Sequence, residues 1–151
     1  MTKTGNARPR VLLVDDYPDA REMYSEYLQF SGFDVVEAAN GMEALRRAAD
    51  DSPDIILMDL SLPVMDGWEA TRRLKADVRT AQIPVVALTG HAIAGISEGA
   101  RQAGCDAFVT KPCLPEDLVR EIRRVLGELT AARVRRKATP AKALSDLESS
   151  R

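Results

Sequence analysis

Four apolar residues followed by two acids, VLLVDD at Val11–Asp16, begin the pattern that decides the fold of this 151-residue chain. Further short apolar runs follow at Val35–Val36, Ile55–Met58, Val85–Leu88 and Ala107–Val109. Short runs rich in β-branched residues favour strands over helices. Continuous rather than alternating apolarity is typical of parallel strands that are buried on both faces. The sequence therefore predicts a parallel sheet covered by helices.

Segments with helix signals separate these apolar runs. The signals are proline at a first helical position, a capping-box pair, and glycine after the last periodic residue. They predict five helices, with starts and ends near Pro18 and Gly32, Asn40 and Ala49, Asp66 and Leu74, Ala92 and Gln102, and Pro115 and Gly127. Alternating strands and helices of this kind predict an α/β fold with a doubly wound sheet and right-handed crossovers.

The composition excludes several other classes of protein. The length fits one domain, and 45% hydrophobic with 29% charged residues is ordinary for a globular chain. No run approaches the roughly 18–20 apolar residues of a membrane span, and the first residues lack the apolar run of a signal peptide. Cys105 and Cys113 match no metal-ligand or CxxC spacing. We therefore expect a cytoplasmic protein with reduced thiols.

The net charge of −2 hides an asymmetry between the two ends of the chain. Residues 131–151 hold six basic and two acidic residues, a charge of +4, so the preceding 130 residues carry −6. A basic tail of this kind can contact nucleic acid, a membrane or an acidic partner. The interpretation we favour is a solvated extension, because no aromatic residue that could stack on bases is interleaved.

Polar side chains stand where the apolar runs end. Asp15 and Asp16 follow the first run, Asp59 the third, Thr89 the fourth and Lys111 the fifth. The carboxyl ends of parallel strands share one edge of the sheet, where open α/β folds bind ligands. Three close carboxylates repel one another unless a cation offsets them, and Mg²⁺ takes carboxylate and phosphate oxygens. A carboxylate can also attack phosphorus, so the pattern predicts a site for Mg²⁺ and a phosphoryl group on or beside an aspartate.

These strand ends belong to four longer motifs, Val11–Asp16, Ile55–Asp59, Val85–Thr89 and Phe108–Pro112, and a fifth motif, Leu62–Gly67, follows the second of them. In this order and spacing they resemble the receiver domain of two-component response regulators, the CheY-like family, in its stand-alone form. The resemblance implies a flavodoxin-like, five-stranded parallel sheet of order 2-1-3-4-5 with five helices. It also implies an N-terminal extension at 1–9, a receiver domain at 10–129 and a basic, flexible tail at 130–151.

The resemblance further implies a role for each acid at the edge of the sheet. Asp59 would accept a phosphoryl group from a histidine kinase or a phosphotransfer protein. Asp16 and Asp59 would bind Mg²⁺ directly, together with the backbone carbonyl of Ser61, and Asp15 would bind it through water. Lys111 would hold phosphoryl oxygens. The protein would then be a switch with no catalytic output beyond its own phosphotransfer and dephosphorylation.

The same resemblance implies how the phosphorylated state is read. Thr89 would be drawn to the phosphoryl group and Phe108 would turn inward after it, although Phe108 can also be ordinary packing on its strand. The Lys111–Pro112 bond is expected to be cis, a form that is rare without proline. His91 and Ser61 would influence dephosphorylation. A downstream partner would contact the face made by the fourth helix, the fifth strand and the fifth helix.

Two other functions stay open at this point. One is a phosphatase or phosphotransferase with an aspartyl nucleophile, although haloacid-dehalogenase-like enzymes place a second Asp where this chain has Ser61. The other is nucleic-acid binding through the basic run Arg133–Lys137. We do not expect binding to a membrane.

Overall fold

The computed structural model describes residues 8–60, 62, 65–90 and 102–138, with side chains in the last range only as far as Gly127. The strands are β1 (Arg10–Val14), β2 (Asp34–Ala38), β3 (Ile55–Asp59), β4 (Val85–Thr89) and β5 (Ala107–Thr110). The described helices are α1 (Pro18–Phe30), α2 (Gly41–Asp51), α3 (Gly67–Ala76) and α5 (Pro115–Ala138). The helix predicted from Ala92 to Gln102 lies almost wholly outside the described residues.

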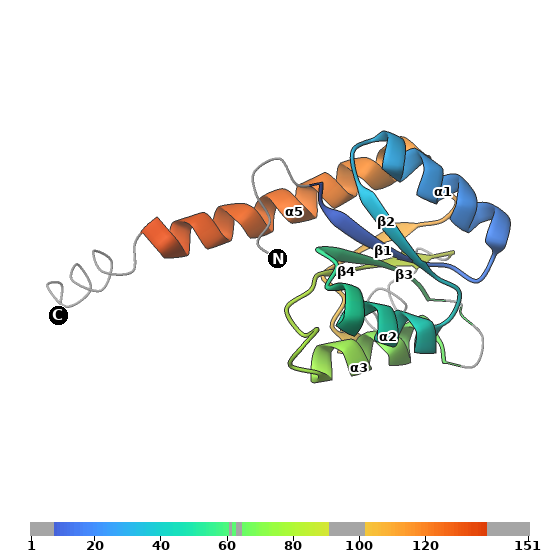
Figure 1. The fold of residues 1–151 in the computed structure, drawn as a ribbon, viewed down its shortest axis with the longest axis horizontal. Coiled ribbons are helices and arrows are strands. Elements are labelled where there is room, and N and C mark those ends of the chain that lie inside the picture. Colours follow the sequence, from blue (N-terminus) through green and yellow to red (C-terminus); the bar gives the residue numbers. More distant parts are fainter. Residues whose placement is uncertain (1–7, 61, 63–64, 91–101, 139–151) are drawn as a thin grey trace, which may run out of the picture.

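The five strands form one parallel sheet in the order β2-β1-β3-β4-β5 (Figure 1), which confirms the predicted topology. The register brings the ends of the strands to the same level. Val14 pairs with Met58, so Asp15 and Asp59 follow side by side, and Thr89 pairs with Thr110 at the end of the sheet. The acids and Lys111 therefore reach one edge because the strands are parallel and in register.

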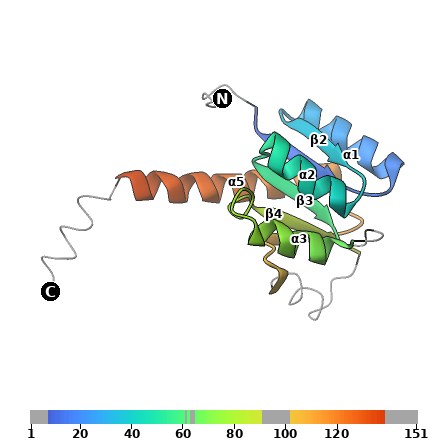
Figure 2. The same ribbon diagram turned by 60° about the horizontal axis from the view of Figure 1, so that its bottom comes forward.

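Helices cover both faces of the sheet (Figures 1 and 2). Alternate residues of the central strands point to opposite sides. Leu13 packs with Leu28 of α1 and Ile122 of α5, whereas Leu12 packs with Ala48 of α2 and Leu74 of α3. The apolar residues of β1 and β3 are fully buried, and each large apolar side chain removed from water contributes about 1.5–3 kcal/mol. The apolar runs of β1 and β3 thus became buried central strands, as predicted. The runs Val35–Val36 and Ala107–Val109 instead lie in the edge strands β2 and β5, which are only partly buried.

Side-chain caps define the starts of α2 and α3. The Asn40 side chain accepts a bond from the Glu43 amide (2.8 Å), and the Glu43 carboxylate accepts one from the Ala39 amide (3.0 Å). Asp66 accepts a bond from the Glu69 amide (2.9 Å). Each cap stabilises its helix by about 1 kcal/mol. The capping signals that were read from the sequence are confirmed.

The end of α5 differs from the prediction. The helix does not stop before Gly127 but continues to Ala138, and its last part extends away from the sheet (Figures 1 and 2). A glycine inside a helix costs only about 1 kcal/mol relative to alanine, and the residues that follow are mostly good helix formers such as Glu, Leu, Ala and Arg. The first part of the predicted flexible tail, residues 130–138, is therefore helical.

Several predictions are not tested by this architecture. The boundaries of the N-terminal extension, the domain and the tail stay predictions, as does the cytoplasmic location. Among the described residues, no helix combines the length and the apolar character that crossing a bilayer requires.

Candidate functional site

Three carboxylates meet at the carboxyl edge of the sheet. Asp15, Asp16 and Asp59 each place an oxygen within 4.8 Å of the others. Asp15 and Asp59 are buried, with 0% and 5% of their surface exposed, whereas Asp16 is exposed. Two of the three acids are therefore buried in the domain, and solvent can reach the third, Asp16. We call these three residues the acidic cluster.

Lys111 brings a positive charge to the acidic cluster. Its Nζ lies 3.4 Å from Asp15 Oδ2 and 3.4 Å from Asp59 Oδ2. Partial burial, the largest contribution, lowers the pKa of Lys111, but the negative charges of Asp59 and Asp15 together outweigh it, so this pKa is raised. With all four groups ionised, three negative charges and one positive charge leave about −2, and a divalent cation would neutralise it.

Asp15 is oriented by the surrounding backbone and by one arginine. Its amide donates to the Ala38 carbonyl (3.1 Å), and its Oδ1 accepts a bond from the Tyr17 amide (2.9 Å). The Arg21 guanidinium donates to the Asp15 carbonyl (2.7 Å) and to Glu37 (3.0 Å). Sequence reasoning missed Arg21, because an arginine in the first turns of a helix is too common to indicate a site.

Gly67 lets the start of α3 press against the end of β3. A Cβ at this position would meet the Asp59 carbonyl oxygen and would lie 2.7 Å from the Leu60 Cα. The Gly67 amide also donates to the Leu60 carbonyl (3.4 Å). The sequence indicated a turn and a cap at Asp66–Gly67, and the cap is present. It did not reveal that this glycine is required by the backbone of Asp59.

Thr89 and Lys111 are linked through the backbone. Thr89 is 5% exposed at the end of β4, and its carbonyl accepts a bond from the Lys111 amide (2.6 Å). The Lys111–Pro112 bond is cis, as expected. Phe108 is 38% exposed, so its ring lies at the surface rather than in the core. Two predicted site residues, Ser61 and His91, lie outside the described residues, and their roles stay predictions.

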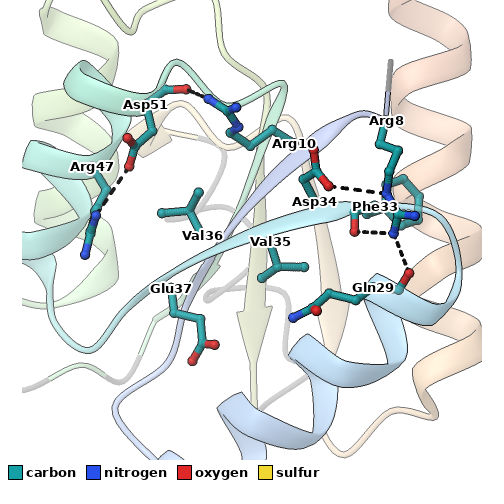
Figure 3. Close-up of a pocket in the computed structure, with 10 residues that line it drawn as sticks. All are labelled: Arg8, Arg10, Gln29, Phe33, Asp34, Val35, Val36, Glu37, Arg47 and Asp51. Atoms are coloured by element: carbon teal, nitrogen blue, oxygen red, sulfur yellow. Dashed lines mark hydrogen bonds and ion pairs between the residues drawn. The ribbon is translucent and has the colours of Figure 1, made fainter. Parts of the chain in front are cut away.

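A separate groove of about 840 Å³ runs along β2 rather than at the acidic cluster (Figure 3). Its arginines contact groups of the chain itself. Arg8 lies 3.3 Å from Asp34, Arg10 donates to the Asp51 carbonyl (2.6 Å), and Arg47 lies 3.6 Å from the Asp51 carboxylate. The first two contacts connect the start of β1 to β2 and to the end of α2, and the third lies within α2. The arginines therefore have a structural role, and we place the chemistry at the acidic cluster.

Comparisons with known proteins agree with this geometry. The family model of the response regulator receiver domain matches residues 11–123. The polar-differentiation response regulator DivK of Brucella anthropi is 36% identical over 118 residues, which cover 78% of this chain and 96% of DivK.

Two solved structures extend the likeness to the fold. The chemotaxis protein CheY4 of Vibrio cholerae is 33% identical with a TM-score of 0.76, and the match covers 79% of this chain and 99% of that one. The receiver domain of the sensor histidine kinase PA1611 of Pseudomonas aeruginosa, solved with a magnesium ion coordinated in its active site cleft, is 36% identical with a TM-score of 0.74. That match covers 80% of this chain and 99% of the other. The chain therefore belongs to the family of response regulator receiver domains, which are phosphorylation-activated signalling switches.

Proposed function

We propose that this chain accepts a phosphoryl group on Asp59 from a histidine kinase or a phosphotransfer protein and passes the resulting state to a downstream protein. One observation carries the proposal. Asp15, Asp16 and Asp59 converge within 4.8 Å, and the Lys111 ammonium lies 3.4 Å from two of them. An arrangement of this kind suits a carboxylate that must accept a dianionic group, because the charge can be offset on several sides.

The acidic cluster fits Mg²⁺ as its cofactor. The cluster offers only carboxylate oxygens, which are the ligands that hard divalent cations prefer. Asp16 and Asp59 would bind the ion directly and Asp15 through water, with the Ser61 carbonyl as a further ligand. When bound, Mg²⁺ supplies positive charge that offsets both the acids and the phosphoryl oxygens.

The chain's own residues perform the transfer. An Asp59 carboxylate oxygen attacks the phosphorus, a new O–P bond forms, and the bond between phosphorus and the donor atom breaks, with the electron pair leaving on the donor. Lys111 holds one phosphoryl oxygen by a charge-assisted bond. The Thr89 hydroxyl donates a hydrogen bond to another. Burial of Asp59, which is 5% exposed, limits the access of competing water.

The phosphoryl group switches the domain through charge. It adds about −1.5 to −2 charges and strong acceptor oxygens beside Thr89. The bond from Thr89 favours a conformer in which Phe108, now 38% exposed, turns inward. A shift of this kind requires that the phosphoryl group interacts better with one conformer than with the other. The altered face would include β5 and α5, together with the segment predicted as a fourth helix.

The test compares wild type with Asp59→Asn in the presence of Mg²⁺ and acetyl phosphate. Wild type should gain one acid-stable, base-labile phosphoryl group by mass spectrometry, and the variant none. Asp66→Asn is the matched control, because it makes the same change at an exposed acid whose capping role asparagine can fill. Equal labelling of wild type and Asp59→Asn, or a label on another side chain, would contradict the proposal.

Membership of the receiver family does not favour the alternative of a phosphatase or phosphotransferase. That alternative requires multiple turnover of a phosphate ester, whereas we expect only hydrolysis of the chain's own aspartyl-phosphate. Nucleic-acid binding requires the basic run 133–137. Deletion of residues 131–151 would then abolish a salt-sensitive affinity for DNA.

A further inference from the structure

The geometry points to Tyr24 of α1 as a positioning residue that holds the loop after β5 so that the Lys111 ammonium faces the acidic cluster. This inference rests on the proposed function of Asp59 and Lys111. It concerns a residue that would act on Lys111 through the backbone that joins Cys113 to Lys111.

The contact that carries the inference joins α1 to the β5–α5 loop. The Tyr24 hydroxyl donates a hydrogen bond to the Cys113 carbonyl, with 3.0 Å between the two oxygens, and lies 3.7 Å from the Cys113 Sγ. Cys113 is two residues beyond Lys111, in the four-residue segment between the end of β5 and the start of α5. Tyr24 therefore holds the loop at its middle.

Burial makes this hydrogen bond hard to replace with water. Tyr24 is 5% exposed, and its ring packs in the core with Leu13, Leu118 and Ile122. Burial, assisted by the Cys113 side chain and by the charge of Asp15, raises the pKa of Tyr24 to about 12. The hydroxyl is therefore protonated and able to donate throughout the physiological range. A buried donor or acceptor that loses its partner is costly, which favours keeping the Cys113 carbonyl in place.

The loop is then fixed on both sides of Pro112. Before it, the Lys111 amide donates to the Thr89 carbonyl (2.6 Å), which ties the loop to β4. After it, the bond from Tyr24 ties Cys113 to α1. The Lys111 Nζ lies 3.4 Å from both Asp15 and Asp59, near the outer limit of a hydrogen bond. A small displacement of the loop would therefore weaken both contacts at once.

Tyr24→Phe tests the inference, because it removes the hydroxyl and retains the ring. We expect acetyl phosphate with Mg²⁺ to phosphorylate this variant about three-fold to ten-fold more slowly than wild type, as befits the loss of one buried hydrogen bond. Mg²⁺ affinity should not fall, because other contacts hold the acids. A merely destabilised fold would lower both the phosphorylation rate and the Mg²⁺ affinity. A lower rate with an unchanged Mg²⁺ affinity therefore supports the inference.

Two matched variants isolate the hydrogen bond. Tyr27→Phe makes the same change on the same helix, at a ring that packs against the same core. Cys113→Ala removes the thiol and leaves the carbonyl that accepts the bond. Both should be phosphorylated at the wild-type rate. A loss in Cys113→Ala equal to that in Tyr24→Phe would overturn the inference, since the thiol would then carry the effect.

A measurement without a phosphodonor separates this inference from the proposed function. In metal-free protein, nuclear Overhauser contacts between the Lys111 ε-protons and the Asp59 β-protons should be present in wild type and weakened in Tyr24→Phe. Unchanged contacts together with unchanged phosphorylation in Tyr24→Phe would overturn the role of Tyr24 alone. Failure of wild type to be phosphorylated on Asp59 would instead overturn the proposed function.

Discussion

The Lys111 Nζ lies 3.4 Å from the Asp59 carboxylate, although 52 positions of sequence separate the two residues. The same atom lies 3.4 Å from Asp15, at a separation of 96 positions. One ammonium group is thus shared by two buried acids. It can lower their mutual repulsion, but it cannot neutralise a cluster of three carboxylates. This imbalance of charge makes the stability of the domain sensitive to both mutation and metal.

Removal of one negative charge from the acidic cluster should stabilise the metal-free protein. We expect Asp16→Asn to raise the free energy of unfolding by about half a kcal/mol without Mg²⁺, because repulsion with Asp15 and Asp59 is relieved at an exposed position. With Mg²⁺ the order should reverse. Wild type would gain about 2.7 kcal/mol at about 100 times the dissociation constant, and the variant much less. Urea unfolding with and without Mg²⁺ measures both.

The matched control for that experiment is Asp19→Asn. Asp19 is an exposed acid in the first turn of α1, where negative charge is favourable. Its removal should lower stability slightly in both conditions. If the two variants respond alike to Mg²⁺, the acidic cluster is not the metal site.

A methyl group at Gly67 should disturb the end of β3. Gly67→Ala places a Cβ against the backbone of Asp59 and Leu60, and overpacking of this kind costs about 1–3 kcal/mol. Phosphorylation of Asp59 should slow as well. Gly127→Ala is the control, because its Cβ would have no described neighbour within 4 Å and it lies inside α5. This change should add about 1 kcal/mol of stability. Equal thermal melting of the two variants would refute the packing argument.

High pH should reveal the buried hydroxyl of Tyr24. Burial, with a smaller contribution from the Cys113 side chain, raises its pKa to about 12, against an ordinary value of about 10. Between these values the folded state retains a proton that the unfolded state releases, so the free energy of unfolding falls as pH rises. Below about pH 10 this contribution is fully present. Ultraviolet titration of phenolate should show a late component that persists in Tyr27→Phe and disappears in Tyr24→Phe. A wild-type protein without that component would contradict the burial of the hydroxyl.

The far part of α5 should be dispensable for the stability of the domain. Among the α5 side chains that the structure describes, which end at Gly127, the buried ones are Leu118, Val119, Ile122 and Val125. Deletion of residues 128–151 should therefore leave the urea midpoint nearly unchanged while it lowers the total helical circular dichroism signal. Ile122→Ala should cost about 2–5 kcal/mol by contrast. An unchanged dichroism signal after the deletion would argue against the helix beyond Gly127.

Local patterns were sufficient for much of the fold. The apolar runs at Val11–Val14 and Ile55–Met58 could be recognised as buried parallel strands because burial on both faces removes the usual alternation. Asn40 and Glu43 could be recognised as a cap because the pattern acts within one helical turn. Gly127 was misleading for the opposite reason. The cost of one glycine to helix stability is small, and the helix propensity of the residues that follow Gly127 outweighs it.

The amino-acid sequence alone determined which residues form strands, which polar groups end them, and therefore that Asp15, Asp59, Thr89 and Lys111 share one edge. These features depend on local periodicity and on the parallel order of strands. Only the tertiary structure decided the hydrogen bonds from Arg21 to the Asp15 carbonyl and from Tyr24 to the Cys113 carbonyl. It also decided the close approach of Gly67 to Asp59. Such contacts depend on how helices dock across the sheet, between segments as far as 89 residues apart. Docking is set by the packing of the whole core, so no short stretch of sequence carries a signal for it.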